Sequence, residues 1–317
     1  MPIPPGLRAS LTLPVIAAPM FLVSGCAGHH KPAAPPALAA RSPGPSSTAR
    51  RHHRPELVIN TCKAGVIGTF PALNARTDDI LDTWLGEITT ALAEYKRQQP
   101  AAPVAPFGVN LIVHKTNPRL QENLAKVVKH KVPVVITSLG AVKEVIAAVH
   151  SYGGLVLHDV TNVVHARKAA AAGVDGLILV CAGAGGHAGA ASPFALLPRV
   201  RSARREAGAP APAAAGADAH APGRRGSGRL RRQIREFFKG IIVLAGAISD
   251  GRAIRAAEVL GADLAYMGTR FIATQESMAD PAYKEMLTNY KDGPAPTFLP
   301  TVYTDKISGA AAAAPPG

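Results

Sequence analysis

The sequence has few cysteines, and their placement excludes several classes of site. Only three are present, Cys26, Cys62 and Cys181, and they form neither a CxxC pair nor any other metal-ligand spacing. Three thiols cannot all pair with one another, which argues against a disulfide scaffold. We therefore expect a reduced, cytoplasmic protein with no dedicated metal site.

Long apolar runs and aromatic side chains are also scarce. No stretch approaches the roughly 18 uninterrupted apolar residues of a membrane span, so we expect no membrane partner. Aromatic residues make up only 5% of a chain that is 47% hydrophobic, and Ala, Gly and Val dominate the rest. This composition is typical of a buried parallel sheet wrapped in helices. At 317 residues the chain is long enough for one large α/β barrel or two ordinary domains.

Acidic residues are scarce in two low-complexity segments, and these segments explain the net charge of +14. Residues 26–54 contain five Lys and Arg and no acid, whereas residues 200–232 contain eight Arg and two acids. Both are rich in Ala, Pro and Arg and lack a hydrophobic period, so we predict two disordered insertions. Because they carry +5 and +6, together +11 of the +14, the charge does not by itself predict a specific nucleic-acid partner.

The first apolar stretch, residues 11–20, has two interpretations. With Leu22-Val23-Ser24-Gly25-Cys26 behind it, it resembles a lipoprotein signal cut before Cys26. Alternatively, residues 13–18 form a first strand that places Pro19 and Met20 at a catalytic face.

After residue 55, apolar runs alternate with amphipathic segments at regular spacing. With 13–18 as the first, the strands are expected at 65–69, 106–112, 132–137, 154–158, 174–180, 240–245 and 262–267. Helices are expected at 55–64, 78–97, 118–130, 141–152, 162–172 and 251–260, with Thr77 and Asn117 as N-caps. Eight such units predict a closed (β/α)8 barrel, whose active site lies at the carboxyl ends of the strands.

The most informative motif is the glycine-rich turn Cys181-Ala182-Gly183-Ala184-Gly185-Gly186-His187-Ala188-Gly189. It follows the apolar run 176–180, which is typical of a buried parallel strand. Glycines allow backbone to approach a ligand, and His187 has little around it to pack against. A flexible loop with an exposed histidine is the alternative.

Two further glycine turns follow the last two expected strands. Gly246 and Ala247 follow the seventh strand and precede a helix, and Gly268 and Thr269 follow the eighth. Barrels of this class commonly bind phosphate at these two positions, because backbone N–H groups and a helix N-terminus attract the anion. The pair predicts a phosphate-bearing cofactor.

Several stretches together resemble the nitronate monooxygenases, formerly called 2-nitropropane dioxygenases. They are LPVIAAPMFLVSG, GVIGTFPALNART, FGVNL, GLILVCAGAGGHAG, VLAGAISDGRAIRAAEVLGAD and YMGTRF. The resemblance runs over residues 11–309 apart from the two insertions. It implies an FMN-dependent barrel that oxidises alkyl nitronates with dioxygen to a carbonyl compound and nitrite.

The resemblance also implies roles for individual residues. His187 matches the active-site histidine, as a base toward a nitroalkane or as an anchor for the nitronate oxygens. The expected FMN contacts are Ala18, Pro19, Met20, Asn110, Asp159, Thr161, Gly185, Gly186, Gly246, Ala247, Gly268 and Thr269.

Plainer interpretations stay open at five positions. Asn110 can simply satisfy backbone at a strand end, and Asp159 can cap the following helix. His158, which precedes it, can be a core histidine that points away from the pocket. Cys181 and Met20 can be packing residues.

The chain departs from the family at both insertions and at its end, where residues 310–317 form an Ala/Pro-rich tail in place of further helices. Three functions therefore remain. The first is nitronate oxidation, with an alkyl nitronate and dioxygen as partners and a homodimer as one possible assembly. The second is FMN-dependent reduction of quinones or enoyl thioesters by NAD(P)H. The third is a catalytically silent fragment of an imperfect gene model, or a binding protein whose basic insertions engage polyanions.

Overall fold

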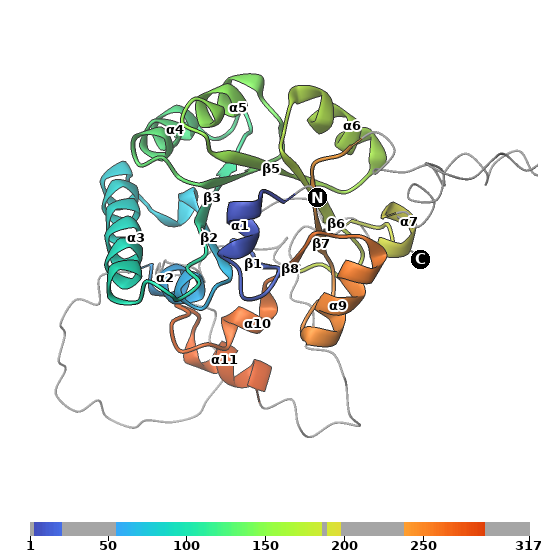
Figure 1. Cartoon of the computed structure of the whole chain (residues 1–317). Coiled ribbons are helices and arrows are strands. Elements are labelled where there is room, and N and C mark those ends of the chain that lie inside the picture. The colour runs from blue at the N-terminus through green and yellow to red at the C-terminus, as the bar shows by residue number, and fades with distance from the viewer. Residues whose placement is uncertain (1–2, 21–54, 186–188, 198–237, 289–317) are drawn as a thin grey trace, which may run out of the picture.

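The computed structural model describes residues 3–20, 55–185, 189–197 and 238–288 (Figure 1). The expected insertions at 26–54 and 200–232 and the tail at 310–317 lie outside the described residues. Within them, eight parallel strands close into a barrel in the order in which they occur in the chain. The predicted (β/α)8 barrel is confirmed.

Each predicted strand is present, shifted by at most a few residues. The strands are β1 Val15–Ala17, β2 Ile67–Pro71, β3 Phe107–Ile112, β4 Val134–Ser138, β5 Leu155–Val160, β6 Gly176–Val180, β7 Ile241–Ala245 and β8 Leu264–Met267. β1 pairs with both β2 and β8, which closes the barrel.

Helices follow the strands and, apart from α1, which lies over the amino end, surround the barrel on its outside (Figure 1). They are α1 Pro5–Ala9, α2 Glu56–Lys63, α3 Asp78–Gln98, α4 Leu120–Lys129, α5 Lys143–His150, α6 Val163–Ala172, α7 Pro193–Leu196, α9 Gly251–Leu260, α10 Thr269–Ile272 and α11 Pro281–Thr288, with a 3-10 turn η1 at Ala72–Asn74.

Side-chain caps set where several of these helices begin. Thr77, Asn162 and Asp250 each accept a hydrogen bond from a backbone N–H in the first turn of α3, α6 and α9. The expected cap at Asn117 is wrong. Its Oδ1 accepts instead from the Arg119 N–H, 3.1 Å away, in a turn, and α4 begins at Leu120 without a side-chain cap.

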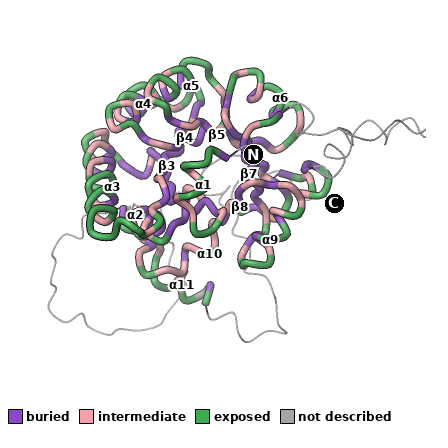
Figure 2. Tube along the Cα trace, viewed as in Figure 1, coloured by how far each residue is buried: buried purple, intermediate pink, exposed green. Residues whose placement is uncertain are grey.

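Alternation along the strands creates two apolar layers. One set of side chains, including Ile16, Ile136 and Ile178, fills the barrel interior, and the intervening set packs against the helices. Figure 2 shows the strands mostly buried and the outer surfaces of the helices exposed. Polar strand residues on the inner face are exceptions to this apolar interior, so they are candidates for a functional site.

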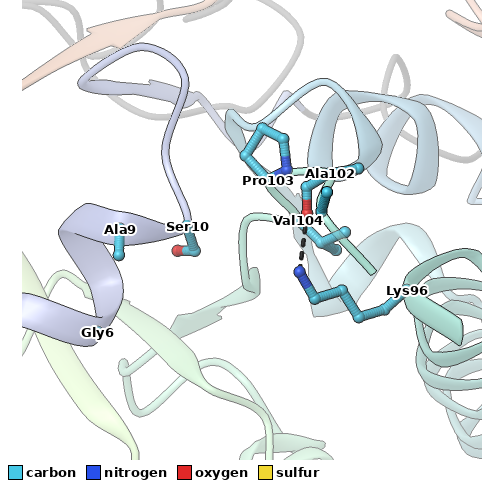
Figure 3. Close-up of a pocket in the computed structure, with 8 residues that line it drawn as sticks. Gly6, Ala9, Ser10, Lys96, Ala102, Pro103 and Val104 are labelled. Atoms are coloured by element: carbon cyan, nitrogen blue, oxygen red, sulfur yellow. Dashed lines mark hydrogen bonds between the residues drawn. The ribbon is translucent and has the colours of Figure 1, made fainter. Parts of the chain in front are cut away.

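The amino end of the barrel is closed by α1 and the residues beside it. Ile3 is buried in the interior cluster, and Leu7 and Leu11 pack against it. A cavity of about 320 Å³ lies there between α1 and residues 101–104. Figure 3 shows Lys96 at its side, where Nζ donates a hydrogen bond to the Ala102 carbonyl oxygen at 2.8 Å. No residue of the expected site lines this cavity. The described residues of the expected site lie instead at or just after the carboxyl ends of the strands.

Candidate functional site

A row of polar side chains lies at the carboxyl ends of β3, β4 and β5. Ser138 and Asp159 are the last inner-face residues of β4 and β5, in step with Ile136 and Leu157 of the interior cluster, and Asn110 is the inner-face residue that precedes Ile112 on β3. Asn110 Nδ2 donates to Ser138 Oγ at 2.7 Å, and Ser138 Oγ donates to Asp159 Oδ2 at 2.5 Å. The three side chains, which we call the polar row, thus form one hydrogen-bonded chain.

One oxygen of the polar row has no hydrogen-bond partner among the described residues. Asp159 Oδ1 is buried and accepts no hydrogen bond from any residue that the structure describes. Burial raises the pKa of Asp159 to about 6, and the hydrogen bond from Ser138 opposes this rise. An unpaired buried carboxylate oxygen is unfavourable in the free protein and is suited to accept a donor from a ligand.

Tyr266 approaches the polar row from across the barrel. It lies on the inner face of β8, and its pKa is raised well above the usual value by burial and by the charge of Asp159. The phenol therefore stays protonated at neutral pH and can donate a hydrogen bond.

His158 points the other way. It shares its face of β5 with Val156 and Val160, which pack against the helices. Its Nδ1 lies 2.8 Å from Thr137 Oγ1, and burial lowers its pKa to about 4. The interpretation of His158 as a core histidine outside the pocket is therefore correct.

Two of the plainer interpretations can also be settled. Asp159 is not a helix cap, because Asn162 Oδ1 accepts from the His165 N–H at 2.9 Å and begins α6. Asn110 does satisfy backbone, since Nδ2 also donates to the Ile136 carbonyl oxygen at 3.2 Å, but it contacts Ser138 as well. Asn110 therefore combines both roles.

The loops after β6 and β7 pack directly on each other. The Ala247 N–H donates to the Gly183 carbonyl oxygen at 2.9 Å. Gly183, Gly246 and Ala247 have φ of +84°, +138° and +51°. A Cβ on Gly246 would lie 2.8 Å from the Ala182 carbonyl oxygen, so only glycine fits there. Positive φ at Ala247 is strain of the kind that clusters at ligand sites.

The ends of β1 and β8 form the neighbouring part of this face. The Ala18 N–H donates to the Met267 carbonyl oxygen at 2.8 Å. A Cβ on Gly268 would lie 3.7 Å from Met20 Sδ and 3.8 Å from Ala18 Cβ. Ala18, Met20 and Gly268 thus lie side by side, with Pro19 between the first two.

Thr269, Thr161 and Gly185 are the other described residues of the expected site. Thr269 begins α10 directly after Gly268. Thr161 lies close to Gly189, because a Cβ added to Gly189 would be 3.3 Å from Thr161 Cβ. Gly185 is exposed after β6. Gly186 and His187 lie outside the described residues.

Cys181 is a packing residue. It is fully buried, and burial raises the pKa of its thiol to about 12. A thiol in this state is a poor nucleophile at neutral pH, so the interpretation as a small buried residue is supported.

Sequence reasoning missed Ser138 and Tyr266. Both are the last inner-face residues of apolar strands, VVITS and LAYM, and inner-face parity at the carboxyl end is the signal that identifies them. Within 3–20, 55–185, 189–197 and 238–288, no cluster of His, Cys, Asp and Glu could hold a metal ion. In the same ranges, no helix has the length and apolar character needed to cross a membrane.

The family model for nitronate monooxygenase matches residues 53–295. A Mycobacterium tuberculosis protein named (3aS,4S,5R,7aS)-5-hydroxy-7a-methyl-1-oxo-octahydro-1H-indene-4-carboxyl-CoA dehydrogenase is 27% identical over 80% of this chain and 57% of its own length. A Neurospora crassa nitronate monooxygenase is 30% identical over 49% of this chain and 34% of its own length. The chain therefore spans little more than half of the first relative and about a third of the second.

A solved structure shares the fold. Nitroalkane oxidase from Streptomyces ansochromogenes has 25% sequence identity, covers 89% of this chain and 72% of its own, and superposes with a TM-score of 0.59. The match of the family model to most of the chain, on an eight-stranded parallel barrel, establishes that this chain belongs to the nitronate monooxygenase family, a family of oxidoreductases.

Proposed function

We propose that this chain is an FMN-dependent oxidoreductase that oxidises alkyl nitronates with dioxygen to a carbonyl compound and nitrite. The observation that carries the proposal is the convergence of glycine turns and the polar row at one end of the barrel. The loops after β6 and β7 are hydrogen-bonded to each other, and Gly268 lies beside Ala18 and Met20. Asp159 presents an oxygen that has no partner among the described residues. The barrel domain would span residues 11–309, in a cytoplasmic enzyme.

The described residues fit FMN. Gly246, Ala247, Gly268 and Thr269 supply backbone after β7 and β8, where barrels bind phosphate. The residues proposed beside the ring are Ala18, Pro19, Met20, Asn110, Asp159, Thr161, Gly185 and Gly186. Asp159 Oδ1 is suited to accept an N–H or O–H group of the bound cofactor or substrate.

When bound, the flavin supplies the electron transfer between substrate and dioxygen. The chain's own residues then bind, orient and exchange protons. His187 is proposed as a base toward a neutral nitroalkane or as a donor to the nitronate oxygens. Tyr266 offers a hydroxyl hydrogen toward the same interior, because its pKa is raised.

A second candidate is FMN-dependent reduction of an enoyl thioester or quinone by NAD(P)H. Two observations favour it. The M. tuberculosis relative is named for a CoA thioester. In addition, Leu139, Val164 and Phe194, which follow β4, β5 and β6, are 65%, 63% and 76% exposed, so the rim of the site offers apolar surface to a large acyl group.

The visible absorption spectrum of the purified chain with FMN distinguishes these functions. We expect flavin bands that change on anaerobic addition of a primary alkyl nitronate and not with NADH, and a response that is lost in His187→Ala. Bleaching by NADH alone would support the reductase instead. A chain that takes up no FMN, yet binds nucleic acid with steep salt dependence, would support the polyanion-binding alternative.

A further inference from the structure

We propose that the loops after β4, β5 and β6 form one apolar surface at the mouth of the barrel, and that this surface selects substrates that carry an unbranched apolar chain behind the reacting group. The surface, which we call the apolar arc, consists of Leu139, Val142, Val164 and Phe194. The proposal rests on the proposed function only in placing the reacting group of the substrate at the carboxyl end of the barrel.

The exposed large apolar side chains of the described residues are unevenly distributed. The four of the apolar arc follow three strands that are hydrogen-bonded neighbours in the barrel. The other two, Leu13 and Val259, lie before β1 and near the end of α9, and therefore at the amino side. Single exposed apolar residues are ordinary, whereas a group of them beside a candidate site indicates a binding surface.

The other described loops at the carboxyl end have a different character. Those after β2, β3, β7 and β8 expose Arg76, Lys115, Arg252 and Arg270. None of the exposed large apolar side chains of the described residues lies there. The mouth of the barrel therefore has one direction in which an apolar chain can leave water while the polar end of the substrate stays near the polar row.

Leu139 is held in its exposed position at a cost to the fold. It has a φ of +66°, which is strained for leucine, and its side chain is mostly exposed. Its neighbours are fixed. The Ser138 carbonyl oxygen accepts from the Val113 N–H at 2.9 Å, and a Cβ on Gly140 would lie 2.7 Å from the Val113 carbonyl oxygen. Because Ser138 belongs to the polar row, the apolar arc begins at the next residue.

The segments that carry Val164 and Phe194 lie side by side. Val164 is in the first turn of α6. A Cβ added to Gly189, in the segment that leads to α7, would lie 3.3 Å from Thr161 Cβ, in the turn that precedes α6. Within α7, Leu196 is buried and anchors the helix, whereas Phe194 is mostly exposed. The apolar arc thus continues across both loops.

The span of the apolar arc sets the length of the chain that it fits. Neighbouring strands lie about 4.8 Å apart, so the ends of three strands cover about 10 Å, which matches an extended chain of roughly six to eight carbon atoms. Full burial of a methylene improves affinity about fourfold. A chain that lies on an open surface is covered on one side, so we expect about twofold for each methylene.

The test measures KM of the full chain, loaded with FMN, for the nitronates of nitroethane and 1-nitrohexane. The four additional methylenes should lower KM about tenfold or more. Substituting Val164→Ser and Phe194→Ser together should bring the ratio of the two KM values below about threefold. Val259→Ser removes an equally exposed apolar side chain at the amino side and should keep the wild-type ratio. Because the readout is a ratio within each protein, a general loss of activity does not imitate the result.

A second arm needs no turnover. Calorimetry without NAD(P)H measures the binding of the acetyl and hexanoyl thioesters of N-acetylcysteamine, and the hexanoyl thioester should bind about tenfold more tightly. A chain-length preference with nitronates alone assigns the chain to an alkyl nitronate, and a preference with thioesters alone assigns it to an acyl thioester. Either result supports the apolar arc.

The proposal would be overturned if neither arm showed a chain-length preference, or if the preference persisted in the Val164→Ser, Phe194→Ser double variant. A dimer that this double variant dissociates, with an unchanged chain-length ratio, would also overturn it, because a second copy would then cover the apolar arc. Failure of the proposed function looks different. The chain would take up no FMN and oxidise neither nitronate, whereas the thioester arm would still report on the apolar arc.

Discussion

The two ends of the barrel are built in opposite ways. At the amino end, Ile3 and Leu7 extend the interior cluster and close the barrel with apolar contacts. At the carboxyl end, the interior finishes in the polar row, one carboxylate oxygen of which has no partner among the described residues. Apolar burial stabilises the fold, whereas an unpaired buried polar group opposes it. The difference indicates which end serves stability and which serves ligand binding.

The same contrast occurs between two adjacent residues of β5. Burial shifts the pKa of both His158 and Asp159, but His158 has a protein partner in Thr137 and Asp159 Oδ1 has none among the described residues. His158 belongs to the layer that packs on the helices, and Asp159 belongs to the barrel interior. A single step along a strand thus separates a structural residue from a candidate ligand-binding one.

The largest expected effect lies in the middle of the interior. Ile136→Ala removes a fully buried side chain and should lower the free energy of unfolding by about 2–5 kcal/mol. Urea unfolding followed by the fluorescence of the single tryptophan, Trp84, measures this. Val259→Ala is the control, because Val259 is 74% exposed and its loss should change stability by less than about 0.5 kcal/mol. Equal effects of the two substitutions would contradict the assignment of the interior layer.

Acidification should destabilise the fold through His158. Its pKa is about 4 in the folded protein and 6.5 in the unfolded chain, so the unfolded chain binds an extra proton between these values. The stabilisation is complete above pH 6.5 and falls by about 3 kcal/mol as the pH drops through 4. Urea unfolding at several pH values should show this slope disappearing in His158→Phe. A slope that persisted unchanged would assign it to other groups.

Asp159 should have the opposite dependence. Its folded pKa of about 6 exceeds the unfolded value, so its stabilisation is present below about pH 4 and is lost as the pH rises through 6. Asp159→Asn should therefore raise the free energy of unfolding at pH 8 by up to about 3 kcal/mol and leave it unchanged near pH 3.

The windows of His158 and Asp159 overlap, so their slopes offset each other in the wild type between about pH 4 and 6. Each single variant should expose the slope of the other residue. A less stable Asp159→Asn variant at pH 8 would mean that the carboxylate is well satisfied in the folded protein, and it would remove the contrast between the two residues.

The smallest expected effect concerns the helix after β7. Asp250→Ala removes the acceptor for the Ala253 N–H, which lies 2.8 Å from Oδ1, and should cost about 1 kcal/mol of stability. Asp250→Asn should retain most of the cap. Thermal unfolding of the two variants checks this, and a loss of equal size in both would indicate a role for the charge.

Much of the fold could be predicted from the sequence because strong local signals agree. The helix at residues 251–260 was predicted with its observed bounds, since Asp250 caps it and Gly261 ends it with φ of +108°. The strands were also predicted, because each is a short apolar run. Helix α1, which closes the amino end of the barrel, was not predicted, because five residues are too few to show a helical pattern. The prediction of Asn117 as an N-cap was wrong, because its side chain accepts a hydrogen bond from Arg119 within a turn.

The candidate site could be predicted only in part. The glycine turns stand out in the sequence because positive φ and close approach demand glycine. Ser138 and Tyr266 belong to no sequence motif, and their importance comes from the closure of the barrel, which turns the inner faces of β4, β5 and β8 toward one interior. Similarly, no pattern in the neighbouring sequence indicates that the Asp159 side chain faces the barrel interior and the His158 side chain faces the helices.

The most direct test of the central claim is a titration of the chain with FMN, followed by the flavin absorption spectrum. It compares the wild type with one glycine substitution at each end. Gly246→Val places a side chain against the Ala182 carbonyl oxygen at the carboxyl end, whereas Gly6→Val at the amino end meets nothing within 4 Å. We predict that the wild type and Gly6→Val bind FMN equally and that Gly246→Val binds at least about tenfold more weakly, a loss of about 1.4 kcal/mol. FMN binding that is weakened by Gly6→Val and not by Gly246→Val, or that is absent from all three proteins, would contradict the account.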